Sequence, residues 1–232
     1  LEESYREIER KETARGELLR RVLSVQEEER KRIARELHDE TTQSILGLVM
    51  RLEAASTGTD ELPPRVKNLL AEIKTLGNRT LDSVHRIIYD LRPSVLDDLG
   101  LLSALRWLAE HRLSPLEVKT RVEVTGEEKK LPPHIEIALF RVVQEALTNI
   151  ARHAEAHNVV VSVEFKESVI LIEVEDDGKG FDISAIGPAS EAKGVGLGLM
   201  GMEERVALLG GKFEIEAHPG DGTHLTIEVP LI

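Results

Sequence analysis

The feature that most limits the fold of this chain is a pair of long helical patterns at its start. The first 55 residues contain no proline and almost no glycine, and their apolar residues recur every three or four positions. A segment rich in turn-forming residues, 56–64, follows. A second helical pattern runs from Leu69 to Leu91 and is ended by Pro93. The spacing therefore predicts two long helices joined as a hairpin.

A hairpin of two helices cannot bury both of its apolar stripes by itself. Two copies of the chain can bury them by closing a four-helix bundle, so we expect this part of the chain to form a homodimer.

The rest of the chain has a mixed pattern. Helices are predicted from Leu99 to His111, from about His134 to His153 and within Gly194–Leu209. Alternating or β-branched runs predict strands at 118–124, 159–165, 169–174, 212–217 and 223–231. We expect an α/β sandwich with an at least partly antiparallel sheet, which makes the whole chain an α+β multidomain protein.

Composition removes several classes of function. With 30 basic and 42 acidic residues the net charge is -12, which argues against a nucleic acid partner. The chain has no cysteine, which fits a reducing cytoplasm and excludes disulfides and thiolate metal sites. No run of about 18 apolar residues occurs, so we expect no membrane contact by this segment. The charged, helical start of the sequence suggests that it is a piece of a longer protein, whose absent N-terminal region could anchor it to a membrane.

His38 stands out on the first helix because Asp39 is beside it and Gln43 follows one turn later. At about 100° per residue, a continuous helix places His38 about 80° from the centre of the apolar stripe. That stripe consists of Ile33, Leu37, Ser44, Leu48 and Leu52. Asp39 and Gln43 would lie one above the other on the solvated side. Asp39 could orient the imidazole for nucleophilic attack, and Gln43 could hold a water. A surface histidine without function would fit the helix equally well.

The helix near residue 145 carries polar residues that suit a nucleotide site. Glu145 and Asn149 are four residues apart, and an amide and a carboxylate oxygen on one helical face suit a hard divalent ion. Arg152 and His153 follow within two turns. The same residues are also compatible with an ordinary solvated helix flank.

Two glycine-rich segments come next. Asp176, Gly178 and Gly180 follow an apolar strand, where a carboxylate can accept a hydrogen bond from adenine and glycines allow close approach of the base. Such a sequence can also be a simple hairpin turn. Gly194, Gly196 and Gly198 open a helix whose N–H groups could hold phosphates. They are not preceded by a strand, so a dinucleotide-binding fold is not indicated, and the chain has no P-loop.

Together, in this order and spacing, these motifs resemble the bacterial sensor histidine kinases of the NarX/DesK-like subfamily. The resemblance covers nearly all of residues 25–232. Its most specific parts are the run from Arg32 to Asp39 and the spacing from Asp39 to Gln43. The link from Leu91 to Leu101 is also similar.

The resemblance implies three regions: residues 1–24 as a signalling helix with a coiled-coil entry, 25–97 as a dimerisation and histidine-phosphotransfer domain, and 98–232 as a GHKL-type ATP-binding domain. His38 would be the phosphoacceptor, and catalysis would also use Asp39, Gln43 and Glu145. Residues implied to bind ATP are Asn149, Arg152, His153, Asp176, Gly178, Gly180, Gly194, Gly196, Gly198 and Thr223. Asn149 would also bind Mg²⁺.

The implied activity is ATP-dependent phosphorylation of His38, transfer of the phosphoryl group to an aspartate of a response regulator, and removal of the group from that regulator. The partners would be a second copy of the chain and a regulator with a receiver domain and a LuxR-like helix-turn-helix. Two alternatives are an ATPase of the gyrase/Hsp90 kind and a dimeric scaffold without catalysis. The ATPase assigns no role to Asp39 and Gln43, and the intact pocket residues argue against the scaffold.

Overall fold

The computed structural model describes residues 2–56, 63–91, 94–183 and 196–231. The chain divides into two compact units, Leu1–Ser94 and Val95–Ile232. In the described parts of the chain, no helix combines the length and the apolar character that crossing a membrane requires.

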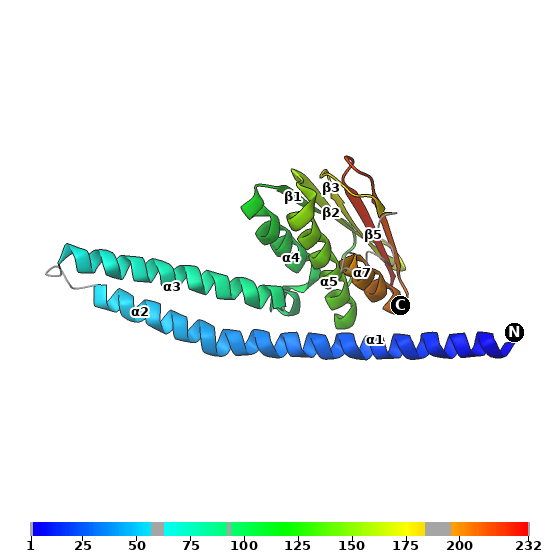
Figure 1. Cartoon of the computed structure of the whole chain (residues 1–232), viewed down its shortest axis with the longest axis horizontal. Coiled ribbons are helices and arrows are strands. Elements are labelled where there is room, and N and C mark those ends of the chain that lie inside the picture. The colour runs from blue at the N-terminus through cyan, green and yellow to red at the C-terminus, as the bar shows by residue number, and fades with distance from the viewer. Residues whose placement is uncertain (1, 57–62, 92–93, 184–195, 232) are drawn as a thin grey trace. The chain divides into compact units, whose positions relative to one another are not determined.

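The first unit is helical. Helix α1 (Glu2–Glu36) continues through a π-helical turn (Leu37–Thr42) into α2 (Gln43–Ser56), and α3 (Pro64–Leu91) returns beside α2 (Figure 1). The predicted hairpin is thus present, but the predicted continuous helix is interrupted at His38. The turn expected at 56–64 and the end at Pro93 lie mostly outside the described residues.

Helices α2 and α3 pack closely. A Cβ atom added to Gly77 of α3 would lie 2.7 Å from Val49 Cγ2 of α2, so a larger side chain would have to displace Val49. Lys74 Nζ also forms an ion pair with Glu53 Oε1 at 2.5 Å across the two helices. The packed side of α2 includes Ile45, Val49 and Leu52.

The second unit is built on a sheet of five strands in the order β1-β2-β3-β5-β4. Strand β1 (Lys119–Gly126) is parallel to β2 (Asn158–Phe165), and the other neighbouring pairs are antiparallel. The remaining strands are β3 (Val169–Asp176), β4 (Lys212–Ala217) and β5 (Thr223–Pro230). The predicted mixed sheet is confirmed, and the bounds predicted for β4 coincide with those observed.

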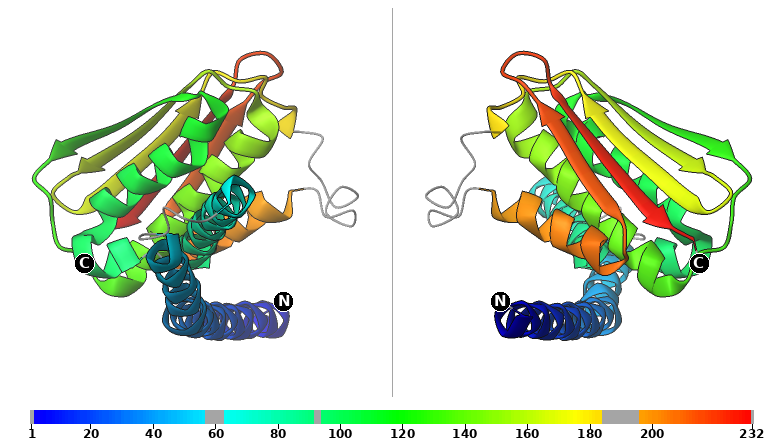
Figure 2. Two further views of the ribbon diagram at one scale, coloured as in Figure 1. Left: turned by 90° about the vertical axis from the view of Figure 1, so that its left-hand side faces the viewer. Right: turned by 90° about the vertical axis from the view of Figure 1, so that its right-hand side faces the viewer.

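Three helices pack on one face of this sheet (Figure 2): α4 (Ser94–Leu113), α5 (Pro133–Asn149) and α7 (Leu197–Leu208). Gly100, with φ 78° and ψ 178°, breaks α4 near its start. The side chains buried between helices and sheet include Leu105, Phe140, Leu147, Ile172 and Ile227. This core fixes the positions of β3, α5 and α7, which carry the candidate nucleotide residues.

The other face of the sheet carries the alternate residues of each strand, which point away from that core. Many of them are glutamates: Glu123, Glu164, Glu173, Glu175, Glu214, Glu216 and Glu228. Nearby basic side chains include Arg121 and Lys212.

Candidate functional site

His38 lies on an exposed surface of the first unit, inside the π-helical turn. Its side chain is 60% exposed and that of Asp39 is 67% exposed. His38 Nδ1 lies 3.0 Å from Asp39 Oδ1, so the expected contact between the two is present. When Nδ1 donates its proton to Asp39, Nε2 carries the lone pair and is the ring nitrogen that can attack an electrophile.

The π-helical turn corrects the predicted arrangement of this surface. Asp39 and Gln43 do not form an ordinary helical pair four residues apart, because the turn between them is wider than an α-helical turn. Within the single chain, Ser44 and Leu48 of the predicted stripe are exposed. Ile45 and Val49, one residue further along, are the residues that face α3.

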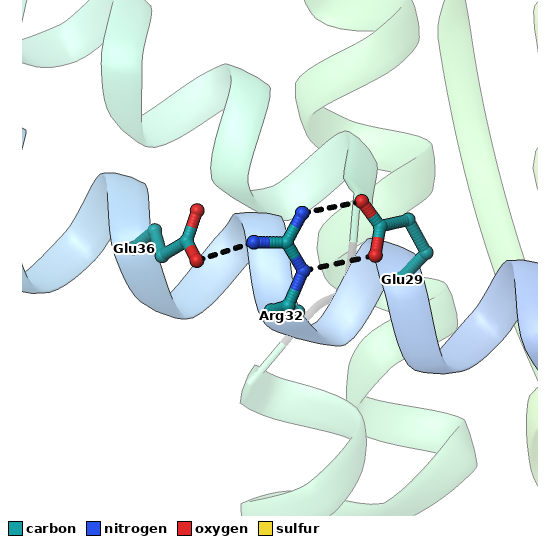
Figure 3. A network of polar contacts seen from close by, with 3 residues as sticks. All are labelled: Glu29, Arg32 and Glu36. Atoms are coloured by element: carbon teal, nitrogen blue, oxygen red, sulfur yellow. Dashed lines mark hydrogen bonds and ion pairs between the residues drawn. The ribbon is translucent and has the colours of Figure 1, made fainter.

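A charged cluster lies on the turn of α1 before His38 (Figure 3). Arg32 donates to both carboxylate oxygens of Glu29, at 2.9 and 2.5 Å, and to Glu36 at 2.5 Å. The hydrogen bond to Arg32 lowers the pKa of Glu29. Because the cluster is exposed, its ion pairs contribute little to the stability of the fold. They connect neighbouring turns within α1.

Asp176 is a buried polar residue among the candidate nucleotide residues. It ends β3, and its side chain is 4% exposed. Its Oδ1 accepts a hydrogen bond from the N–H of Gly178 at 2.9 Å, and Thr223, its cross-strand partner on β5, donates another. Burial nevertheless raises the pKa of the Asp176 carboxyl. Two hydrogen bonds leave a carboxylate capacity to accept one from an adenine amino group.

The loop after Asp176 rests on the end of the α5 segment. A second π-helical turn, Ile150–Ala154, extends α5 and contains Arg152 and His153, both exposed. The carbonyl of Ala154 accepts a hydrogen bond from the N–H of Lys179 at 2.8 Å. Gly180 has a φ of 55°, and a Cβ atom there would lie 2.0 Å from the carbonyl oxygen of His218. No residue with a side chain fits this position.

Glu145 of α5 lies beside the start of α7. A Cβ atom added to Gly198 would lie 2.4 Å from Glu145 Oε1. Gly196, with φ 88°, immediately precedes α7, whose first N–H groups can hold an anion. Glu145 and Asn149 are half-buried on α5. Gly194 and most of the segment from 182 to 193 lie outside the described residues.

The structure thus brings three candidate segments around α5. The Asp176 loop meets the end of α5, Thr223 meets Asp176, and Gly198 meets Glu145. His38 belongs to the other unit, Leu1–Ser94. Within the described part of the chain, His, Asp and Glu side chains form no group of three that could hold a metal ion.

Sequence reasoning missed the role of Asp177. Its Oδ1 accepts hydrogen bonds from the N–H groups of His157 and Asn158, at 2.7 and 2.8 Å, and its Oδ2 accepts one from Asn158 Nδ2 at 2.6 Å. The hydrogen bonds to Asn158 lower the pKa of Asp177 to about 2. Asp177 therefore fastens the loop to the start of β2.

Comparisons with known proteins match both units. Residues 29–96 match a family described as histidine kinase. Residues 134–232 match the family described as histidine kinase-, DNA gyrase B-, and HSP90-like ATPase.

Two relatives are named signal transduction histidine-protein kinase/phosphatase DegS. The one from Bacillus subtilis (strain 168) is 39% identical over 219 residues, covering 91% of this chain and 55% of the relative. The one from Brevibacillus brevis is 36% identical over 215 residues, covering 90% of this chain and 53% of the relative. The chain therefore spans about half the length of these relatives.

Among solved structures, the histidine kinase domain from the Erythrobacter litoralis EL346 blue-light activated histidine kinase has a similar fold. The TM-score is 0.50 at 18% identity, covering 82% of this chain and 94% of that one.

Proposed function

We propose that this chain, which belongs to the sensor histidine kinases of the NarX/DesK-like subfamily, transfers the γ-phosphoryl group of ATP to its own His38. The observation that carries the proposal is the 3.0 Å contact between His38 Nδ1 and Asp39 Oδ1 on an exposed surface. A surface histidine without a chemical role needs no neighbour that fixes which of its two ring nitrogens carries the proton.

In the proposed reaction, Asp39 holds the Nδ1 proton and so keeps the lone pair on Nε2. Nε2 forms a bond to the γ-phosphorus while the bond from that phosphorus to the leaving oxygen of ADP breaks. The ring becomes positive as it gains the phosphoryl group, and the Asp39 carboxylate stabilises that charge and can accept the Nδ1 proton.

The second unit would hold the nucleotide. Asp176 would accept a hydrogen bond from the adenine amino group, with Thr223 orienting the carboxylate. The N–H groups at Gly196 and Gly198, with Gly194, Arg152 and His153, would hold the phosphates. Asn149 would offer its amide oxygen to Mg²⁺, which takes most of its ligands from phosphates and water and neutralises their charge. We assign Glu145 to the same catalytic group because it lies against Gly198.

The test is labelling with γ-³²P-ATP. The wild-type chain is expected to take up acid-labile label, as phosphohistidine does, and His38→Gln is expected to take up none. His85→Gln, on α3, is the matched control and should label normally. Calorimetry must show that His38→Gln still binds ATP. Labelling of His38→Gln at the wild-type rate would overturn the assignment and point to His85 or His153.

The phosphoryl group would then pass from His38 to an aspartate of a receiver domain, in a regulator that we expect to carry a LuxR-like helix-turn-helix. The two relatives are named kinase/phosphatase, which supports a reverse activity as well. Gln43 has no charge and cannot be a base at neutral pH, but its amide can hydrogen-bond a water.

Gln43→Ala is therefore expected to spare phosphorylation of His38 and to slow dephosphorylation of the receiver domain at least about tenfold. The measurement follows loss of label from a phosphorylated receiver domain, chosen because it accepts the group from His38 of the wild-type chain. Glu40→Ala, another exposed residue of the same turn, is the control. Equal loss rates in wild type and Gln43→Ala would remove this role from Gln43.

We also propose the division into residues 1–24 as signalling entry, 25–97 as dimerisation and phosphotransfer domain, and 98–232 as ATP-binding domain. The observed units are Leu1–Ser94 and Val95–Ile232, and they support a boundary close to the one proposed between residues 97 and 98. The partner in the dimer would be a second copy of this chain.

A further inference from the structure

The backbone leaves the sheet at Asp177, and the side chain of that residue determines how it leaves. Strand β3 pairs with β2 as far as Asp176, which lies opposite Val159. One residue later, the N–H of Asp177 still donates to the carbonyl of Asn158, at 3.3 Å. In a continued antiparallel ladder, the N–H of Asn158 would return a bond to the backbone carbonyl of Asp177. It donates instead to Oδ1 of the Asp177 side chain, at 2.8 Å. The side chain therefore takes the place of the backbone as acceptor.

The Asp177 carboxylate is held at both of its oxygens. Oδ1 accepts a second hydrogen bond from the N–H of His157 at 2.7 Å, and Oδ2 accepts one from Asn158 Nδ2 at 2.6 Å. Two backbone donors and one side-chain donor of consecutive residues thus converge on one carboxylate. Hydrogen bonds to a charged acceptor are stronger than those to a neutral one, so this clamp holds Asp177 firmly against the start of β2.

Gly178 is the first residue beyond the clamp, and it is confined between two neighbours. It is buried, and its N–H donates to Asp176 Oδ1 at 2.9 Å. A Cβ atom added to Gly178 would lie 2.7 Å from that same oxygen and 2.8 Å from Ala154 Cβ, so a side chain does not fit. The N–H of Gly178 belongs to the peptide that follows Asp177. The clamp on Asp177 therefore holds the peptide that delivers a hydrogen bond to Asp176.

The other attachments of this loop hold the residue after Gly178. The N–H of Lys179 donates to the carbonyl of Ala154 at 2.8 Å, and the carbonyl of Lys179 accepts from the N–H of Gly220 at 2.7 Å. Lys179 Nζ also lies 2.7 Å from Glu155 Oε1, in an ion pair whose side chains are both exposed. These contacts keep the loop in place further along, but they do not orient the peptide between the two residues before Lys179.

We propose that Asp177 is a positioning residue that sets the selectivity of the site for adenine. It acts through Asp176: the clamp on β2 orients the peptide before Gly178, and the N–H of Gly178 then fixes the Asp176 carboxylate toward the adenine amino group. Asp177 does not contact the nucleotide, and no covalent bond changes at it. Without the clamp, the phosphates of a nucleotide are still held, but its amino group is no longer recognised. The inference rests on the proposed function, in which Asp176 accepts the hydrogen bond from adenine.

Calorimetry on the full chain with Mg²⁺ compares two ligands, ADP and purine riboside 5′-diphosphate, which has a hydrogen in place of the amino group. Neither ligand can phosphorylate His38. Wild type is expected to bind ADP about 10- to 150-fold more tightly, the contribution of one charge-assisted hydrogen bond. Asp177→Ala is expected to bind the two ligands within about threefold of each other. Its affinity for purine riboside diphosphate should stay within about threefold of wild type.

Two further variants separate the shape of the clamp from its charge. Asp177→Asn keeps an oxygen for the N–H groups of His157 and Asn158 without the charge, and its preference for ADP should stay within about threefold of wild type. Asp177→Glu keeps the charge but carries the oxygens one methylene further, and it should lose the preference as Asp177→Ala does. Glu155→Gln is the matched control, because it removes the exposed ion pair to Lys179 from the same loop and should leave the preference unchanged.

Hydrogen exchange tests the geometry without a nucleotide. In Asp177→Ala, the amide of Gly178 is expected to exchange at least about tenfold faster than in wild type, because it no longer holds its partner Asp176. The amide of Ile172, in the middle of β3 and fully buried, should be unchanged, which shows that the sheet is intact.

The outcomes that would overturn the proposal are distinct. A parallel loss of affinity for both ligands in Asp177→Ala would be a general structural effect, and it would remove the positioning role. Equal preferences for ADP in Asp177→Asn and Asp177→Glu would also overturn it, and this comparison decides the matter if Asp177→Ala does not fold. Equal binding of the two ligands by wild type would instead refute the proposed contact between Asp176 and adenine.

Discussion

Asp176 is the single residue on which nucleotide affinity should depend most, because it is a buried carboxylate at the end of β3. The deprotonated carboxylate accepts a charge-assisted hydrogen bond from the adenine amino group, which is stronger than the bond that the neutral acid can accept. Burial raises the pKa of Asp176, so protonation begins at a higher pH than for an ordinary aspartate. We predict that ATP affinity falls as the pH drops through this raised pKa, and that the loss begins above the usual range near pH 4.

Calorimetric titration with a non-hydrolysable ATP analogue across pH 5–8 measures this effect. Asp176→Asn is expected to bind about 10- to 150-fold more weakly at pH 7, since a charge-assisted hydrogen bond contributes about 1.5–3 kcal/mol. The phosphates of the nucleotide also titrate and change the affinity with pH. Because Asp176→Asn lacks the titrating carboxyl, the pH dependence of its affinity shows the contribution of the phosphates alone. Parallel pH curves for wild type and Asp176→Asn, or equal affinities at pH 7, would mean that the adenine binds elsewhere.

The two neighbouring aspartates show how far a single residue could be predicted. A carboxylate directly after an apolar strand was enough to nominate Asp176. The function of Asp177 depends on the approach of His157 and Asn158, 20 and 19 residues earlier, to its two oxygens. No local pattern encodes that approach, because it follows from the pairing of β2 with β3.

At the scale of elements, the strands were predictable and the helix at His38 was only partly so. One face of the sheet is covered and the other is not, so each strand alternates between buried and exposed residues, and that alternation is visible in the sequence. The π-helical turn at Leu37–Thr42 shifts the helical period, so a fixed 100° per residue does not select Ile45 and Val49 as the residues that face α3, although Leu52 of the predicted stripe does lie on the packed side.

The spacing carried no signal for the turn. Thr41, which is partly buried, is four residues from both Leu37 and Ile45, as in a regular helix. The second π-helical turn, Ile150–Ala154, follows Asn149. Such turns are frequent at functional sites, and both of these occur beside residues chosen from the sequence for their chemistry.

For the whole molecule, the exposed apolar side chains of the first unit predict self-association. Those on α2 and α3 include Leu48 at 60% exposed, Leu69 at 55% and Leu76 at 65%. Surfaces of this kind on a monomer mark an interface. We predict that Leu76→Glu raises the dimer dissociation constant at least about tenfold, because a charge would be buried there without a partner.

Sedimentation velocity over a range of concentrations measures the change. Asn78→Glu, two residues away on a different side of α3 and also exposed, adds the same charge and serves as the control. Dissociation of both variants alike would indicate a general charge effect, and unchanged association of Leu76→Glu would place the interface on other residues.

The glutamate-rich face of the sheet has a consequence for such a dimer. Joining two copies through their hairpins holds the two ATP-binding units at a high effective concentration, at which even a weak attraction between their sheets would lead to stacking. Glu173, Glu175, Glu214 and Glu216 instead give both faces the same sign of charge, within a chain of net charge -12. Like charges repel, and this repulsion weakens as salt is added. In such a dimer, the acidic face would therefore disfavour stacking of the two sheets.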